Sequence, residues 1–210
     1  MNITVIGASS GIGLLVVKQA LDKGYQVTTL SRRTQSLPAH AALSAISGSA
    51  TSVTYVKRAI SKADAVIVTI GKSSDKQPSL FSDTGRALIA AATELHTRVP
   101  FLAITGFGAG ESHSYNPLWV KLVMNTILKK EYEDKTRFEK MLADSSLRWE
   151  IVRPGLLTNH SWTGQYQVVP ELYKGMKVSR ISRADVADFL LRQAENPTLL
   201  HKYVALTYSR

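Results

Sequence analysis

The turn at residues 7–13 constrains the fold of this chain more than any other part of the sequence. The β-branched run Asn2–Ile6 leads directly into Gly7-Ala8-Ser9-Ser10-Gly11-Ile12-Gly13, and apolar residues then recur at helical spacing up to Gly24. A glycine-rich turn between a strand and a helix lets backbone approach a pyrophosphate at the helix N-terminus. We therefore expect a dinucleotide site that uses Gly7, Ser9, Ser10, Gly11, Ile12 and Gly13.

Each glycine of this turn has its own expected role. Gly7 lets the chain leave the strand sharply, Gly11 lets backbone approach the phosphates, and Gly13 lets the helix pack closely on the sheet. The spacing is Gly-x-x-x-Gly-x-Gly rather than Gly-x-Gly-x-x-Gly. A purely structural turn is the competing interpretation, and the position after the first strand favours a ligand.

Short β-rich runs alternate with helical segments along the whole chain. Strands are expected at 2–6, 26–30, 43–46, 65–70, 101–105, 148–153 and 203–207, and helices at 14–23, 52–61, 87–95, 117–143 (either continuous or with a break) and 183–195. The helix after residue 116 should start with Asn116 as its cap and Pro117 in its first turn. This alternation predicts an α/β fold, a single-domain Rossmann-like doubly wound parallel sheet over residues 1–210. The irregular segment 156–180 is the expected substrate lid.

The end of the second expected strand indicates which cofactor the chain prefers. It reads Leu30-Ser31-Arg32-Arg33, without the Asp or Glu that binds the ribose hydroxyls of NAD. An arginine guanidinium suits a 2′-phosphate in both charge and geometry. We expect Ser31, Arg32 and Arg33 to bind the cofactor, and we expect NADP(H) rather than NAD(H), although two solvated loop arginines remain the alternative.

Composition excludes several classes of protein. The 210 residues include no cysteine, which removes disulfides, thiolate metal sites and cysteine nucleophiles, and we expect no metal. The net charge is +10, but the basic residues are scattered or interleaved with acids, so we expect no nucleic-acid partner. The N-terminal apolar run is too short for a signal peptide, and no stretch approaches the ~20 apolar residues that span a bilayer. A cytoplasmic monomer or small homo-oligomer without membrane contact is expected.

Four segments together resemble the short-chain dehydrogenase/reductase superfamily. Within it they resemble the atypical NAD(P)-binding branch that includes flavin reductase/biliverdin reductase B-like and NmrA-like proteins. The segments are 7–13, 63–71, 134–155 (in its two parts, 134–139 and 147–155) and 181–187. The resemblance covers nearly the whole chain, and it is not specific for a substrate.

The resemblance implies roles for particular residues. Ile70 and Gly71 would run beside the adenine-ribose half of the cofactor, and Pro154 and Gly155 would lie near the nicotinamide. Thr105 matches the active-site Ser/Thr region, and Lys135 matches the lysine that contacts the nicotinamide ribose. For Asp64 and Asp185 we favour structural roles in capping and loop hydrogen bonds.

The chain departs from the tyrosine-dependent members of that superfamily at one position. Those members carry Tyr-x-x-x-Lys, and four residues before Lys135 stands Glu131. Tyr132 lies about 100° away from that register on a helix, so we expect its hydroxyl to miss the site. His113 and Tyr115, in the loop after the fifth strand, are the replacement candidates for a proton donor, against the alternative of a surface loop without chemistry.

The resemblance implies hydride transfer from NADPH to a flavin, a quinone or a small carbonyl or enone. The main alternative is a non-enzymatic NADP-binding redox sensor that recognises a protein partner, as NmrA-like proteins do. Epimerase or isomerase chemistry is less favoured, because the sequence lacks the large C-terminal substrate domain expected for nucleotide sugars.

Overall fold

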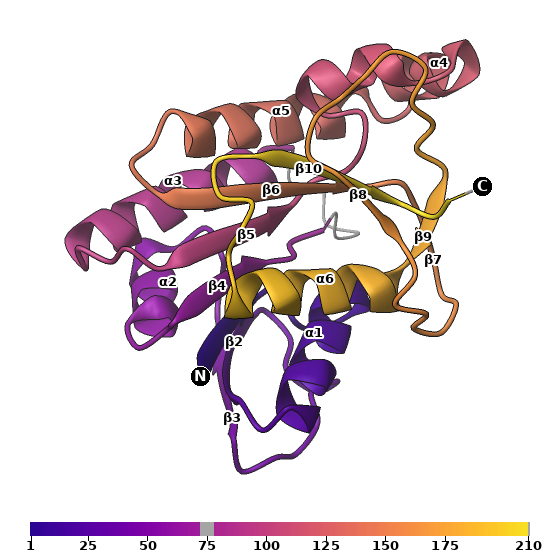
Figure 1. Cartoon of the computed structure of the whole chain (residues 1–210). Helices are drawn as coiled ribbons and strands as arrows, with labels where there is room; N and C mark the ends of the chain where they lie inside the picture. The colour runs from indigo at the N-terminus through magenta and orange to yellow at the C-terminus, as the bar shows by residue number, and fades with distance from the viewer. Residues whose placement is uncertain (72–77, 210) are drawn as a thin grey trace.

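A single eight-stranded sheet forms the centre of the computed structural model, which describes residues 1–71 and 78–209 (Figure 1). Its strands are β1 (Asn2–Ile6), β2 (Gln26–Ser31), β3 (Leu43–Ser47), β4 (Ala65–Val68), β5 (Pro100–Ile104), β6 (Arg148–Pro154), β8 (Gln167–Val169) and β10 (Tyr203–Thr207). Two further strands, β7 (Leu156–Thr158) and β9 (Arg180–Ser182), pair with each other. The helices are α1 (Gly11–Asp22), α2 (Val53–Ile60), α3 (Leu80–Glu94), α4 (Leu118–Thr126), α5 (Lys129–Ala143) and α6 (Arg183–Glu195), with the 3-10 helix η1 (Gly110–Tyr115).

The strand order is β3-β2-β1-β4-β5-β6-β10-β8, and the order changes direction between β1 and β4. All neighbouring pairs run parallel except β10 and β8, which are antiparallel. This is the Rossmann-like doubly wound sheet that the alternation of strands and helices predicts. Ligands bind outside the carboxyl ends of such strands where the order reverses, so the fold places a site beside β1 and β4.

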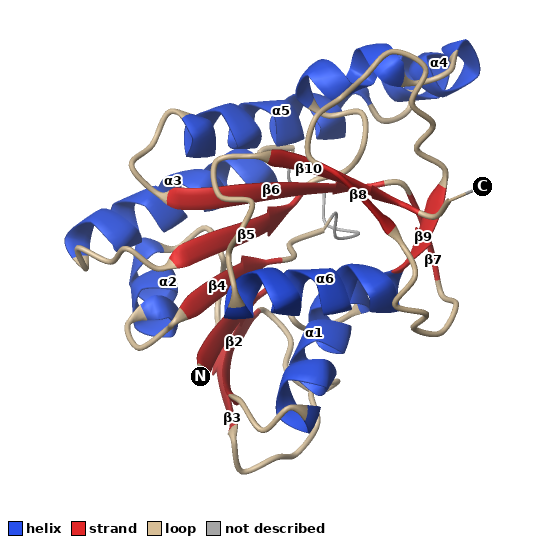
Figure 2. Cartoon of the chain, viewed as in Figure 1, coloured by secondary structure: helices blue, strands red, loops and turns tan. Residues whose placement is uncertain are grey.

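Helices cover both faces of the sheet (Figure 2). Apolar residues of α1 and α6 pack on one face, including Val16, Val17 and Leu190. The other face is covered by α2, α3 and α5, with Leu88 and Phe138 among the buried residues. Because both faces are covered, the central strands are apolar along their whole length, and all four residues of β4 are buried.

Three details differ from the sequence-based expectation. β4 ends at Val68 instead of residue 70, because the neighbouring strand β1 ends at Ile6, which is the partner of Val68. The fourth helix begins at Leu118, with Pro117 rather than Asn116 as its cap residue. Asn116 instead ends η1, and its side-chain amide donates to the carbonyl of Ser112.

The segment 156–180 is more regular than expected. It contains β7 and β8, and β8 extends the main sheet as an antiparallel edge strand. These strands have only three residues each, which is too short to leave a periodic pattern in the sequence.

The structural roles predicted for Asp64 and Asp185 are confirmed. Asp64 accepts the Asn2 N–H at 2.7 Å. Asp185 is fully buried and accepts hydrogen bonds from the Tyr208 hydroxyl at 2.6 Å and from the backbone of Thr163 and Gly164 at 2.9 Å. Asp185 therefore ties the start of α6 to the segment that follows β7.

Candidate active site

The glycines of the 7–13 turn differ in what surrounds them. A Cβ built on Gly13 would lie 2.4 Å from both the Gly7 carbonyl oxygen and the Thr69 hydroxyl, so α1 packs too closely for any side chain there. Gly11 has φ +56°, and the nearest heavy atom to its built Cβ is Arg183 Nε at 4.0 Å. Gly13 is therefore the packing glycine, and the face of Gly11 is open to a ligand.

Neighbouring hydroxyls fix the shape of this turn. Ser31 Oγ accepts the Ala8 N–H at 2.8 Å, and Ser36 Oγ donates to the Ser9 carbonyl at 2.5 Å. Ser10 caps α1 without a side-chain hydrogen bond, and the first turn of α1 holds no acidic residue. Backbone N–H groups at the start of α1 are thus left for an anion, which the helix dipole also favours.

A cavity of about 470 Å³ opens above this turn. Its lining includes most of the cofactor residues predicted from the sequence: Gly7, Ser9, Ser10, Gly11, Ile12, Ser31, Arg32, Arg33, Ile70, Gly71, Thr105 and Lys135. Among the described residues of the lining there is no Asp or Glu. Open backbone at Gly11, two arginines and the lack of carboxylates suit the phosphates of a dinucleotide.

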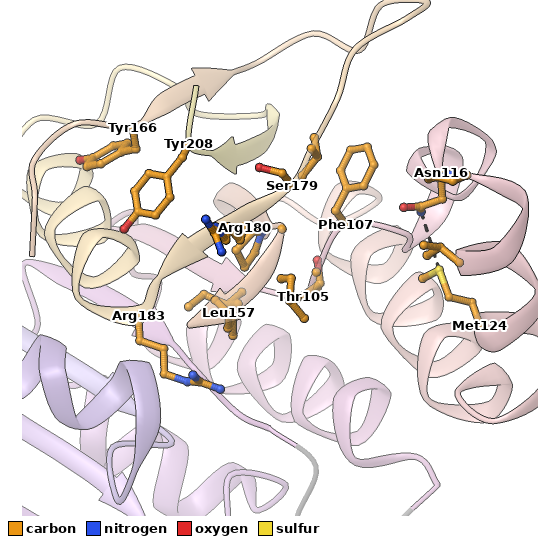
Figure 3. Close-up of a pocket in the computed structure, with 18 of the residues that line it drawn as sticks. Thr105, Phe107, Asn116, Met124, Leu157, Tyr166, Ser179, Arg180, Arg183 and Tyr208 are labelled. Atoms are coloured by element: carbon orange, nitrogen blue, oxygen red, sulfur yellow. Dashed lines mark hydrogen bonds between the residues drawn. The ribbon is translucent and has the colours of Figure 1, made fainter. Parts of the chain in front are cut away.

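A second cavity, of about 1420 Å³, adjoins the first. Figure 3 shows part of its wall, with Thr105, Leu157 and Arg180 near the centre and with Phe107 on one side and Tyr208 on the other. Pro154 and Gly155, predicted to lie near the nicotinamide, line this larger cavity rather than the smaller one. The five residues common to both linings are Ile104, Thr105, Lys135, Leu157 and Arg183. The two cavities therefore meet at the end of β5, where Thr105 and Lys135 stand.

Thr105 belongs to a buried ionic network. Its hydroxyl donates to Glu139 at 2.5 Å, and Glu139 pairs with Arg153 at 2.7 Å. Arg153 is also held by Glu111 at 2.7 Å. Burial opposes the charge of Arg153, but hydrogen bonds to Glu139 and Glu111 outweigh it and raise its pKa. Because the Thr105 hydrogen is committed to Glu139, the Thr105 oxygen keeps only its acceptor capacity for a ligand.

Lys135 lies between two neighbours on α5. Its Nζ is 2.9 Å from Glu131 Oε1, so the residue in the tyrosine register forms an ion pair with the lysine. On the other side, Lys135 Nζ lies 4.7 Å from the ring centroid of Tyr132. From α5, Asp134 accepts the N–H groups of Phe81 and Ser82 at the start of α3, which holds Lys135 in place.

The expected orientation of Tyr132 is wrong. Tyr132 lines the large cavity, and a Cβ built on Gly106 would lie 3.4 Å from its hydroxyl. Residues three and four apart both neighbour a helical position, so Tyr132 and Glu131 flank Lys135 on opposite sides. Burial, and secondarily the charge of Glu131, raise the pKa of Tyr132, which keeps its hydroxyl protonated.

His113 and Tyr115 lie elsewhere. Both belong to η1, and neither is among the described residues that line the two cavities. Tyr115 packs against a small apolar cluster that includes Phe107 and Met176. The proton-donor role proposed for this pair has no support from their positions.

Sequence reasoning missed Arg180 and Arg183 as residues of the cavity walls. Arg180 is the first residue of β9, a strand of three residues, and Arg183 follows that strand. Arg183 stands in the recognised segment 181–187, but nothing in the sequence relates it to Gly11.

Among the described residues there is no helix long and apolar enough to cross a membrane, and no cluster of three or more His, Asp or Glu side chains that could hold a metal.

Comparisons with known proteins also indicate a site for NAD(P)H. A family model described as NAD(P)H-binding matches residues 7–197. A Bacillus subtilis protein named as an uncharacterized sugar epimerase, YhfK, is 26% identical over 216 residues, which cover 99% of this chain and 94% of YhfK.

Solved structures share the fold. A short-chain dehydrogenase/reductase from Veillonella parvula, solved in complex with NADP, has a TM-score of 0.83 at 17% identity, covering 98% of this chain and 94% of that one. ChuY from Escherichia coli O157:H7, described as an anaerobillin reductase, has a TM-score of 0.78 at 24% identity, covering 99% and 97%.

Proposed function

The chain belongs to the NAD(P)H-binding family, and from this premise we propose that it is an NADP(H)-dependent reductase that passes hydride to a large, flat acceptor such as a flavin or a quinone. The observation that carries the proposal is the junction of the two cavities at Thr105 and Lys135. A cofactor seated on the 7–13 turn would reach this junction with its nicotinamide end, and the larger cavity would hold the acceptor next to it.

The choice of NADP(H) over NAD(H) is supported by Arg32 and Arg33. Both line the smaller cavity at the end of β2, where NAD-preferring sites carry an acid. A guanidinium binds a phosphate through charge-assisted hydrogen bonds that an adenosine 2′-hydroxyl cannot match.

Residues at the junction would position the reactants. The bound cofactor supplies the hydride, and the protein supplies placement and electrostatics. Lys135, held by Glu131, would bind the nicotinamide ribose. The Thr105 oxygen, as an acceptor, would receive an N–H or O–H of a ligand, and the Tyr132 hydroxyl would donate a hydrogen bond to the acceptor.

The larger cavity supports the acceptor class. At about 1420 Å³ it exceeds the roughly 300–1,000 Å³ of typical small-molecule sites, which favours a flavin or quinone over a small carbonyl or enone. Aromatic side chains in its wall include Phe107, Trp119 and Tyr208. Its described lining has cations but no Asp or Glu, and Arg180 has no side-chain partner among the described residues. Segment 156–180 contributes much of this wall, which supports its role as a lid.

NADPH oxidation with a panel of flavins, quinones and small carbonyls tests the proposal. We expect turnover with the large acceptors, and we expect Arg180→Ala to raise the KM for flavin mononucleotide but not for uncharged riboflavin. Sugar epimerisation, named for YhfK, returns its cofactor unchanged, so net oxidation distinguishes the two chemistries. Tight NADPH binding without turnover of any acceptor would overturn the reductase and favour the redox sensor.

A further inference from the structure

Arg183 occupies a position that none of the assigned roles explains. It is the first residue of α6 and lines both cavities. Its Nε is the nearest heavy atom to a Cβ built on Gly11, at 4.0 Å. Figure 3 shows its side chain extending from α6 at the edge of the larger cavity, near Leu157. A cation from the last helix thus stands beside the phosphate-binding turn of the first.

One hydrogen bond orients the Arg183 side chain, and a helix cap fixes the backbone from which it extends. Arg183 Nη1 donates to Asn159 Oδ1 at 2.8 Å, just beyond the end of β7. Ser182 Oγ accepts the Asp185 N–H at 3.0 Å and fixes where α6 begins. A guanidinium has five N–H donors, so the bond to Asn159 leaves others for a ligand. No Asp or Glu of the described cavity linings competes for them.

The chemistry of the neighbourhood identifies the ligand group. Gly11 is the glycine whose open face lies toward the ligand, and its backbone starts α1, where the helix dipole favours an anion. An arginine at this place meets a bridging pyrophosphate with matching charge and fork geometry.

We propose that Arg183 binds the pyrophosphate of NADP(H) beside Gly11, and that its hydrogen bond to Asn159 ties the segment after β7 to the bound cofactor. The cofactor would then bridge α1 and α6, which already pack together in one layer of the core. This inference rests on the cofactor binding in the proposed function and not on the identity of the acceptor.

Calorimetric titration with fragments of the cofactor tests the proposal. The probes are NADPH, 2′-phospho-ADP-ribose, which keeps the pyrophosphate but lacks nicotinamide, and adenosine 2′-monophosphate, which lacks the pyrophosphate. Arg183→Ala should weaken NADPH and 2′-phospho-ADP-ribose about tenfold or more, because it removes a charge-assisted contact, and should leave adenosine 2′-monophosphate within about twofold. Arg58→Ala, which removes an exposed cation of α2 outside both cavities, should change none of the three.

Two further variants keep the test decisive if Arg183→Ala unfolds. Arg183→Lys keeps the charge but loses the fork, and Asn159→Ala releases the guanidinium; each should give a smaller loss with the same dependence on the probe. An unchanged affinity for 2′-phospho-ADP-ribose, or an equal loss for adenosine 2′-monophosphate, would overturn the proposal. Because these titrations involve no acceptor, they stand even if the protein reduces nothing, and failure of the reductase assay would leave their result intact.

Discussion

Tyr132 and Thr105 both line the larger cavity, and their hydroxyls have opposite hydrogen-bonding character. The Thr105 hydroxyl donates to Glu139, so its oxygen can only accept a further hydrogen bond. Tyr132 lines the larger cavity with a raised pKa, so it remains a donor at neutral pH. A substrate oxygen that gains negative charge during reduction needs a donor, which makes Tyr132 rather than Thr105 the residue to test.

Tyr132→Phe should lower kcat about 10- to 100-fold with unchanged affinity for NADPH, because only the hydrogen bond to the acceptor is lost. Since burial and Glu131 raise the pKa of Tyr132, the unmutated enzyme should keep its rate from pH 7 to 9 as far as this group is concerned. Steady-state NADPH oxidation over that range is the measurement, with the exposed Tyr55→Phe as control. An unchanged kcat in Tyr132→Phe would mean that water delivers the proton.

Thr105 is predicted to matter through Glu139. Thr105→Val removes the donor to a carboxylate that is 2% exposed, and should lower the free energy of unfolding by about 1–3 kcal/mol and reduce turnover. Thr105→Ser keeps the hydroxyl and should stay close to the unmutated protein in both respects. Urea unfolding and NADPH oxidation measure the two effects. If Thr105→Val were as stable as the unmutated protein, the buried Glu139 carboxylate would not need the hydrogen bond from Thr105.

Cofactor choice is predicted to depend on Arg32 and Arg33. NADPH should bind more tightly than NADH, and replacing both arginines with alanine should erase the difference, a loss of about 1.5–3 kcal/mol for charge-assisted contacts. Fluorescence titration of both cofactors measures this, with Arg58→Ala again as the matched control. Equal affinities in the unmutated protein would contradict the assignment.

At the scale of elements, two glycines of the 7–13 turn have different predicted roles. Gly13 allows close packing of α1, and Gly11 leaves room for the cofactor. Gly13→Ala places a methyl group 2.4 Å from the Gly7 carbonyl oxygen, so it should disturb the junction of β1 and α1 and lower stability. Gly11→Ala meets no backbone but must adopt φ +56°, and its methyl group occupies the face open to phosphate. We expect Gly11→Ala to remain folded by circular dichroism and to lose NADPH affinity. Normal NADPH binding by a folded Gly11→Ala would place the cofactor elsewhere.

Elements with a strong local pattern are predictable from the sequence. The apolar run of β4 predicts a buried strand of the sheet, and the glycine turn predicts residues that line the smaller cavity, because buried parallel strands and phosphate turns impose local requirements on the chain. The pair Glu131–Lys135 also follows from its i,i+4 spacing. The hydrogen bond of the Asn116 side-chain amide could not be predicted, because its acceptor is the Ser112 carbonyl and not a group of the helix that follows.

At the scale of the whole molecule, contacts between segments that are far apart in the sequence could not be predicted from the sequence alone. Arg183 meets the 7–13 turn only because α1 and α6 pack on the same face of the sheet. Tyr132 lines the larger cavity from α5, a helix that packs against α3 through Phe138 and Asp134. Periodicity indicates that a helix has a buried face, but the partner of that face, and hence the wall of the larger cavity, is fixed by the assembled fold.

The assembled core also contains a carboxyl group that should make stability depend on pH. Glu150, in β6, is fully buried, and neither of its oxygens has a hydrogen-bond partner among the described residues. Burial raises its pKa to about 8. Between the ordinary pKa near 4.3 and this value, the unfolded chain has lost the proton that the folded protein keeps, so stability falls as pH rises.

Glu150→Gln should remove this dependence, because the amide is neutral in both states. The unmutated protein should lose up to about 1.4 kcal/mol of unfolding free energy per pH unit relative to the variant between pH 5 and 8, and the difference should level off above the folded pKa. The total difference would be roughly 2–5 kcal/mol. Urea unfolding at unit steps of pH from 5 to 9 measures it, with Glu171→Gln as control because that side chain is 81% exposed. Parallel curves for Glu150→Gln and the unmutated protein would mean that Glu150 ionises inside the fold at its ordinary pKa.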